Sequence, residues 1–250
     1  MTNILKKKKA KLSNQEKLIE KMLDEFDFLT ACEIIVDTIG EREFDELAAN
    51  EFRRPGYKPN VLHEEIYNLD SRIVITPNVD KIYEQHAMTV SKSSVVVKSY
   101  FEEDIAKFLR TNDYLIIRAH GCVDDTSRMI FTQKQYSIAR CKYSSFYRLL
   151  DALVLTHTFI FIGCGIKDPD IQLTLENLNF LYPECRPHYF ITAENEYAGD
   201  VIKVLNHNRN LEVLTYENSD GSHSNLSLSL QKLNELVEEE RKKIADTLTW

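Results

Sequence analysis

Six short runs rich in β-branched residues constrain the fold of this chain more than any other feature. From residue 72 onward they read RIVIT, SVVVKSY, YLIIRAH, TFIFIG, HYFIT and LEVLTY. Helical patterns separate several of them, as in DKIYEQHA, FEEDIAKFLR, SFYRLLDALVLT, DIQLTLENLNFL and YAGDVIKVLN. Apolar strands that alternate with helices are typical of a parallel sheet covered on both faces. The sequence therefore predicts an α/β fold.

Both ends of the chain carry helical patterns instead. Ser13 and Glu16 have the spacing of a capping box, and the apolar residues that follow recur at helical spacing as far as Phe52. The last residues predict a long amphipathic helix. We therefore expect a helical N-terminal region over residues 1–70, an α/β core over 71–218 and a C-terminal amphipathic helix over 219–250.

The composition argues against several classes of protein. With 43% hydrophobic residues among 250, the chain can bury a large core, so it is not a disordered protein. The net charge of −8 argues against nucleic-acid binding, although the basic block KKKKAK at residues 6–11 leaves a local contact open. The apolar runs are too short to cross a membrane, and no secretory segment follows Met1. Five cysteines without a C-x-x-C pair fit a reducing compartment. We expect a cytoplasmic protein.

Small or functional residues follow several of the predicted strands. RIVIT ends in Thr76 and leads to Asn78 and Asp80, YLIIRA leads to His120, and TFIFI leads to Gly163, Cys164, Gly165 and Asp168. Because ligands of open α/β sheets bind at the carboxyl ends of the strands, we expect these residues to line one cleft.

Each of these residues also has a purely structural interpretation. Asn78 or Asp80 suits the cap of the next helix, and His120 suits a histidine satisfied within the core. Asp168 before a proline suits an N-cap, although the same helix N-terminus could serve an anionic ligand. The glycines permit either a tight turn or a close approach of a ligand to the backbone. The spacing of the cysteines and His120 does not match a zinc site.

The order of three motifs is more specific than any one of them. ITPNVDKIYE, then RAHG, then FIGCGIKDPDI resembles the sirtuin-like family of prokaryotic antiphage defence proteins, over about residues 20 to 215. The resemblance implies a Rossmann-like parallel sheet with helices on both faces and a helical N-terminal insertion. It also implies a pocket for NAD, which is the substrate of these enzymes.

The family's chemistry assigns a role to each motif. The resemblance implies that Asn78 orients the ribose and a water, and that His120 is the general base when the nicotinamide–ribose bond is cleaved. Asp80 would hold the ribose or the nicotinamide side. The remaining implied dinucleotide-binding residues are Thr76, Gly163, Cys164, Gly165 and Asp168.

Two departures from the family modify this expectation. Deacetylating sirtuins carry a four-cysteine zinc module after the histidine, whereas the corresponding segment here has only Cys122 and Cys141. We therefore expect NAD+ hydrolysis and no zinc. The family also opens with a strand and a Gly-Ala-Gly-x-Ser loop, which nothing before Leu18 offers, so the first glycine-rich βα unit is expected to be absent.

Two functions follow from this resemblance. The first is an NAD+ hydrolase that depletes the cofactor in antiphage defence, as an oligomer activated through a nucleotide signal or a nucleotide-processing or nucleotide-sensing partner protein. The alternative is a catalytically incomplete sirtuin-like module, which only binds a ligand or regulates a defence complex.

Overall fold

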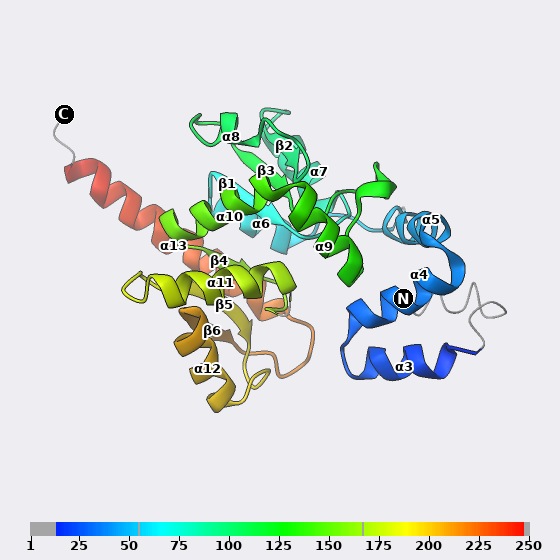
Figure 1. The fold of residues 1–250 in the computed structure, drawn as a ribbon. Coiled ribbons are helices and arrows are strands. Elements are labelled where there is room, and N and C mark those ends of the chain that lie inside the picture. The colour runs from blue at the N-terminus through cyan, green and yellow to red at the C-terminus, as the bar shows by residue number, and fades with distance from the viewer. Residues whose placement is uncertain (1–13, 55, 167, 248–250) are drawn as a thin grey trace. The chain divides into compact units, whose positions relative to one another are not determined.

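The computed structural model describes residues 14–54, 56–166 and 168–247. The chain divides into two compact units, each discontinuous in sequence. The first unit contains Met1–Pro59 and Ser71–Phe146, and the second contains Asn60–Asp70 and Tyr147–Trp250. Figure 1 labels the helices and strands of both units. The predicted capping residue Ser13 lies outside the described residues.

The first unit contains a three-stranded parallel sheet in the order β1–β3–β2. The strands are β1 (Ile73–Thr76), β2 (Val96–Ser99) and β3 (Leu115–Arg118). The register pairs both Thr76 and Ser99 with Arg118. All three strands therefore end together, so whatever follows them starts from one edge of this sheet.

Three helices precede this sheet, as the apolar spacing of the N-terminal region predicts: α3 (Glu16–Asp24), α4 (Phe28–Ile39) and α5 (Glu41–Phe52). Asp27 caps α4 by accepting a hydrogen bond from the Thr30 backbone N–H at 3.1 Å. The buried faces of these helices form a core with three residues of the loops after β1 and β3, namely Val79, Cys122 and Val123. The N-terminal helices thus support the loops that carry the predicted site residues.

The connections in the first unit differ in part from the predicted helices. The stretch FEEDIAKFLR forms only the short helix α8 (Ile105–Phe108). Glu102, predicted to be helical, instead accepts a hydrogen bond from the Ser99 backbone N–H at 2.6 Å and closes a turn. Helix α7 (Ile82–Val90) follows β1 as expected. Helix α10 (Ser144–Thr156), most of which belongs to the second unit, covers the predicted stretch SFYRLLDALVLT.

The sequence interpretation missed one helix of the first unit, α9 (Gln133–Lys142), which follows the 3-10 turn η1 (Thr126–Arg128). A capping box starts α9: Thr132 Oγ1 accepts from the Gln135 backbone N–H at 3.2 Å, and the Gln135 side chain accepts from Thr132 N at 3.1 Å. The T-x-x-Q spacing was therefore a readable signal.

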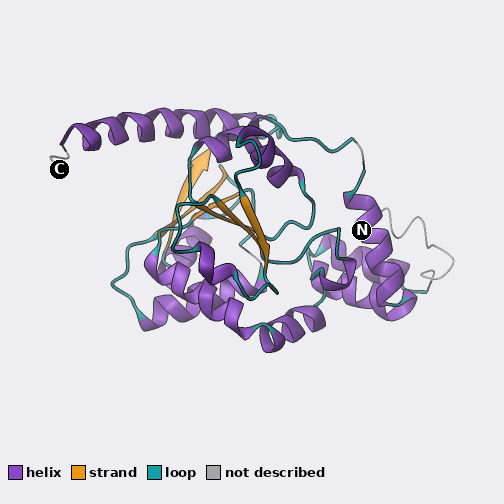
Figure 2. Cartoon of the chain, turned by 90° about the horizontal axis from the view of Figure 1, so that it is seen from above, coloured by secondary structure: helices purple, strands orange, loops and turns teal. Residues whose placement is uncertain are grey.

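The second unit contains another three-stranded parallel sheet, in the order β4–β5–β6. Its strands are β4 (Ile160–Ile162), β5 (His188–Ala193) and β6 (Leu211–Tyr216), and its helices are α6 (Val61–Asn68), α11 (Pro169–Leu181), α12 (Gly199–Arg209) and α13 (Ser224–Thr247). Helix α13 packs on α6 and β6 through a core that includes Leu226 and Leu230. Figure 2 shows α13 as one continuous helix leading to the C-terminus.

The structure confirms the α/β class, with parallel strands and flanking helices. The six predicted strands are all present, and they are distributed over two sheets of three. Among residues 14–54 and 56–72 the structure has helices and no strand. The division into a helical region, a core and a C-terminal helix stays a prediction, because the two compact units follow other boundaries.

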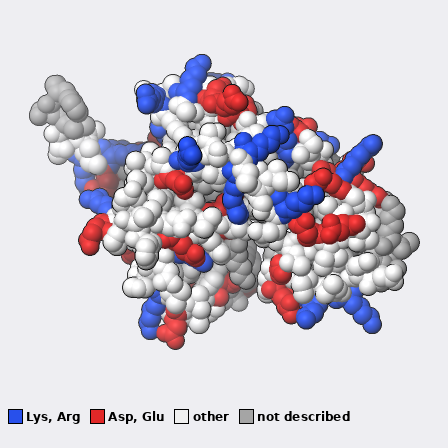
Figure 3. Space-filling model, in the orientation of Figure 1, with Lys and Arg blue, Asp and Glu red and all other residues white. Residues whose placement is uncertain are grey.

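Charged side chains of both signs are interspersed on the face drawn in Figure 3, and a group of acidic side chains lies over α4 and α5. These two helices contain one basic residue, Arg42, beside Glu33, Asp37, Glu41, Glu43, Asp45, Glu46 and Glu51. No helix within the described residues combines the length and the apolar character that a membrane span needs.

Candidate active site

The segment after β1 is held in shape by its own side chains. Thr76 Oγ1 accepts a hydrogen bond from the Asn78 backbone N–H at 3.1 Å, and Asp80 Oδ1 accepts one from the Ile82 N–H at 2.9 Å. Asp80 therefore satisfies an N–H of the first turn of α7, which agrees with the structural interpretation of this residue. Val79 is buried while Asn78 is exposed. The turn thus anchors its middle residue and presents the Asn78 amide outward.

His120 lies two residues beyond β3 and is buried, with 6% of its surface exposed. Its ring packs edge-to-face on Tyr136 of α9, with 5.0 Å between centroids, and the Tyr136 hydroxyl lies 3.5 Å from Nδ1. The His120 carbonyl accepts a hydrogen bond from the Ile130 N–H at 3.1 Å. These contacts fix the imidazole, and they are compatible with either a core histidine or a catalytic one.

Two backbone hydrogen bonds join the segment of His120 to the segment of Asn78. The Ala119 N–H donates to the Thr76 carbonyl at 2.8 Å, and the Val123 N–H donates to the Val79 carbonyl at 2.9 Å. The parallel pairing of β1 and β3 is thereby continued past the ends of the strands. The structure therefore brings two predicted segments, Thr76–Asp80 and the loop of His120, side by side.

The loop after His120 needs the glycine at position 121. Gly121 has a φ of +80°, and a Cβ at this position would overlap the backbone carbonyl of Arg128. The chain folds back here through an isolated antiparallel bridge between Cys122 and Asp125. A side chain at position 121 would push away the backbone at Arg128, so the shape of the loop depends on this glycine.

An ion network centred on the buried carboxylate of Glu84, which the sequence interpretation missed, lies beside these segments. Arg118, the last residue of β3, donates to Oε2 of Glu84 on α7 from Nε at 2.7 Å and also from Nη2. Lys81 Nζ lies 3.5 Å from Glu84 Oε1 and 2.7 Å from Asp124 Oδ2. A charged residue inside the apolar run YLIIRA was the available signal, since a buried arginine requires a partner.

The charges of this network agree with its geometry. The hydrogen bond to Lys81 lowers the pKa of Asp124, and the same bond raises the pKa of Lys81. Both groups are therefore ionised across the neutral range.

The other predicted site residues belong to the second unit, after β4. Gly163 has a φ of +61°, which suits a glycine turn. Asp168 caps α11: its Oδ1 accepts from the Asp170 and Ile171 N–H groups, both at 3.0 Å, with Pro169 at the start of the helix. The N-cap interpretation of Asp168 is therefore confirmed. Burial raises the pKa of Cys164 to about 11, so it is a neutral thiol at pH 7.

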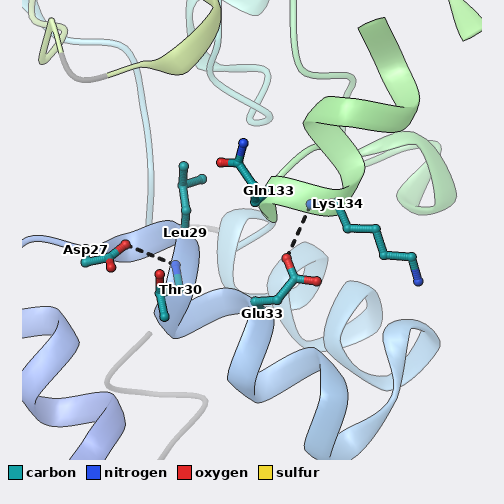
Figure 4. A pocket seen from close by; sticks show the side chains of 6 residues that line it. All are labelled: Asp27, Leu29, Thr30, Glu33, Gln133 and Lys134. Carbon is teal, nitrogen blue, oxygen red and sulfur yellow. Dashed lines mark hydrogen bonds between the residues drawn. The ribbon is translucent and has the colours of Figure 1, made fainter. Parts of the chain in front are cut away.

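Figure 4 shows a pocket of the first unit, of about 420 Å³, where α4 and α9 begin. Its lining comprises Asp27, Leu29, Thr30, Glu33, Gln133 and Lys134, and none of the predicted site residues is among them. Asp27 is engaged as the cap of α4, and Glu33 Oε2 accepts from the Lys134 backbone N–H at 3.4 Å. Both carboxylates thus serve helix starts.

Comparison with known families agrees with this arrangement of segments. The model of the SIR2-like domain matches residues 72–214, which is more than half of the chain and includes every predicted site residue. The chain belongs to the SIR2-like domain family. This family membership confirms the sirtuin-like resemblance of the three motifs.

Curated relatives of this SIR2-like chain are named for NAD+ hydrolysis or for defence. NAD(+) hydrolase ThsA from Enterococcus faecium is 28% identical over 131 residues, 52% of this chain and 27% of the relative. The ThsA protein of Cytobacillus dafuensis is 23% identical over 167 residues, 66% of this chain and 33% of the relative. Defense-associated sirtuin 2 from Bacillus subtilis is 23% identical over 194 residues, 75% of this chain and 19% of the relative. The chain thus spans a third or less of the length of these relatives.

Proposed function

We propose that this SIR2-like chain hydrolyses NAD+ at the nicotinamide–ribose bond, as the NAD-depleting effector of an antiphage defence system. Cleavage of this bond leaves an oxocarbenium-like ribose carbon, which a water attacks as its proton is removed. Such chemistry requires a group that positions the water and a base that accepts the proton.

Two residues of the first unit are proposed for these tasks. The Asn78 amide, exposed beyond β1, would orient the ribose and the water. His120 would accept the proton, because imidazole has an ordinary pKa close to neutral pH. The Tyr136 hydroxyl lies 3.5 Å from Nδ1 of this proposed base.

The other predicted residues are proposed to bind the dinucleotide. Thr76 and Asp80 shape the turn around Asn78, so their proposed contribution to NAD+ binding is through that turn as well as through their remaining polar atoms. Gly163, Cys164, Gly165 and Asp168 are proposed to line the dinucleotide from the start of α11. There the partial positive charge of the helix N-terminus favours a phosphate.

The main support for this proposal is the backbone pairing of the Asn78 and His120 segments. In a chain whose SIR2-like region spans residues 72–214, the Ala119–Thr76 and Val123–Val79 hydrogen bonds hold the Asn78 and His120 segments together. Relatives named NAD(+) hydrolase support the choice of reaction. A neutral Cys164 thiol also argues against this cysteine as the nucleophile.

We further propose that an oligomer, and a protein partner or nucleotide signal, control this activity, since unregulated NAD+ loss would harm the host cell. A partner that senses or processes nucleotides would link infection to hydrolysis.

Nicotinamide release tests the proposed function. The purified chain is incubated with NAD+, alone and with the proteins encoded beside it, before and after addition of extract from phage-infected cells. We expect release of nicotinamide in at least the complete, activated mixture. Binding of NAD+ without release in every mixture would contradict hydrolysis.

Binding of NAD+ without release of nicotinamide would instead support a ligand-binding module without catalysis. Specific observations favour this alternative: the side chains of Thr76, Asp80 and Asp168 already accept intrachain hydrogen bonds. Measurement of NAD+ affinity by calorimetry, alongside nicotinamide release, separates the two functions.

A further inference from the structure

The Glu84–Arg118 ion pair lies within the first unit at the junction of the two segments proposed for catalysis. The side chain of Glu84 is 5% exposed and that of Arg118 is 17% exposed. Two guanidinium nitrogens contact the same carboxylate oxygen, and Lys81 approaches the other oxygen at 3.5 Å. A buried carboxylate therefore meets cations from two different elements, β3 and α7.

The position of each charge along the chain is informative. Glu84 lies one helical turn after Asp80, and Arg118 lies two residues before His120. Asp124, which pairs with Lys81 at 2.7 Å, lies four residues after His120. The network thus contacts the His120 segment on both sides of the histidine, and it connects that segment to the helix that starts beside Asn78.

The backbone hydrogen bonds alone do not achieve the same restraint. The Ala119–Thr76 and Val123–Val79 bonds join the two loops, but neither involves a residue of α7, so they do not themselves restrain rotation of that helix about its axis. A bifurcated contact from a planar guanidinium to a carboxylate on α7 restrains that rotation, because its geometry is directional.

Stability is a poor explanation for a charge pair at this place. Replacing a buried ion pair by apolar residues of similar volume is often neutral or stabilising, since desolvation offsets the Coulomb attraction. A leucine on α7 against a methionine on β3 would fill the same space. The ion pair differs from such an apolar pair mainly in how sharply it orients the two elements.

We propose that Glu84 and Arg118 are a positioning pair, which sets the orientation of Asn78 relative to His120 for NAD+ hydrolysis. Neither residue is proposed to touch the substrate, so both act through the segments they connect. This inference rests on the proposed hydrolysis. It assigns a role to Glu84, the last residue of ITPNVDKIYE, and to Arg118, the first residue of RAHG, to which the sequence interpretation gave none.

The decisive variant is the double substitution Glu84→Leu with Arg118→Met. We expect this apolar pair to fold, with a Tm within a few degrees of wild type. We expect kcat for nicotinamide release to fall about 10- to 100-fold, because misplacing catalytic groups by about 1 Å can cost that much. KM should change less than about threefold, since substrate contacts are retained.

Two further variants keep the test interpretable. Arg118→Lys retains a charge but lacks the planar fork, so we expect it to fold and to lose part of the kcat lost by the double variant. Arg72→Met is the matched control. Arg72 is a partly buried arginine at the opposite end of the same sheet, and its guanidinium contacts backbone carbonyls only. Its kcat should stay within about twofold of wild type.

The outcomes separate this inference from the proposed function. No nicotinamide release by activated wild-type protein would overturn both. An active wild type whose folded double variant keeps kcat within twofold would overturn the positioning role alone. If the double variant does not fold, full kcat in folded Arg118→Lys overturns the positioning role, and a lowered kcat with unchanged KM supports it.

Discussion

The two ends of the sheet in the first unit use arginine in opposite ways. At the amino end, Arg72 donates to the carbonyls of Phe108, Leu109 and Thr111, at 3.0 to 3.3 Å, and satisfies the backbone of an incoming loop. At the carboxyl end, Arg118 pairs with the buried carboxylate of Glu84. Arg72 thus satisfies backbone carbonyls, whereas Arg118 connects two segments that carry side chains proposed for catalysis.

This difference follows from the parallel arrangement of the strands. Parallel strands end at one common edge, where loops and helix N-termini gather, so groups from distant parts of the sequence meet there. The opposite edge receives chain returning from helices and needs mainly backbone satisfaction. We therefore expect that substitutions of polar side chains at the carboxyl end mainly change catalysis and that those at the amino end mainly change stability, whereas a glycine required by the backbone affects stability at either end.

The largest expected effect at the carboxyl end is that of His120→Ala. Removing the proposed general base should lower the rate of nicotinamide release about 10²- to 10⁴-fold. The matched control is His207→Ala, at an exposed histidine on α12. We expect this variant to release nicotinamide at the wild-type rate. Nicotinamide release measured by chromatography, with circular dichroism to verify folding, checks both variants. Equal activity of His120→Ala and wild type would remove this residue from the mechanism.

Gly121→Ala tests the backbone of the same edge. The added Cβ would overlap the Arg128 carbonyl, and the φ of +80° is unfavourable for alanine, so we expect a loss of about 3 kcal/mol or more in unfolding free energy. Gly221→Ala is the matched control. Gly221 has a φ of +68° but nothing near its Cβ position, so only the cost of its φ, about 1 kcal/mol, is expected. Urea midpoints that do not differ between the two variants would contradict the packing argument.

Arg72→Met tests the amino end. Three carbonyls lose a charged donor, so we expect about 1–3 kcal/mol of lost stability. The kcat of the folded variant should stay close to that of wild type. Thermal unfolding and nicotinamide release, measured on the same sample, check this. A large fall in kcat with unchanged stability would erase the distinction between the two ends.

The smallest expected effect concerns Asp45 on α5, in the helical layer behind the carboxyl-end loops. Burial, with Glu41 nearby, raises the pKa of Asp45 to about 7. Because this value lies above the ordinary 3.8, the folded state holds the proton more tightly than the unfolded chain does. Stability is therefore lost as pH rises from about 4 through 7.

Asp45→Asn removes this titration. Relative to wild type, its Tm should be about 3 °C or more higher at pH 8 and nearly equal at pH 4. Nicotinamide release should not change. Parallel Tm–pH curves for the two proteins would show that Asp45 does not titrate in this range.

The strands were predictable because their signal is local. Runs such as RIVIT and YLIIRAH contain consecutive apolar, β-branched residues, a pattern typical of parallel strands, and all six predicted runs form strands. The cap at Asp168 was predictable for the same reason, since its proline neighbour and its helix are adjacent in sequence.

Features that depend on distant contacts were not predictable to the same degree. FEEDIAKFLR has a helical pattern, yet Glu102 bonds the Ser99 N–H and only Ile105–Phe108 are helical. The partner of Arg118 lies on α7, 34 residues away in sequence. The distribution of six strands over two sheets is likewise a tertiary property, which no single run encodes.

We propose that water attacks NAD+ at the carboxyl end of the sheet in the first unit. Reaction in ¹⁸O-labelled water under activating conditions, comparing wild type with Asn78→Ala, tests it most directly. The account predicts nicotinamide release by wild type with one labelled oxygen in the ADP-ribose product, and a rate at least about 100-fold lower for the folded Asn78→Ala variant. Wild-type rates in Asn78→Ala, or a product without label, would contradict it.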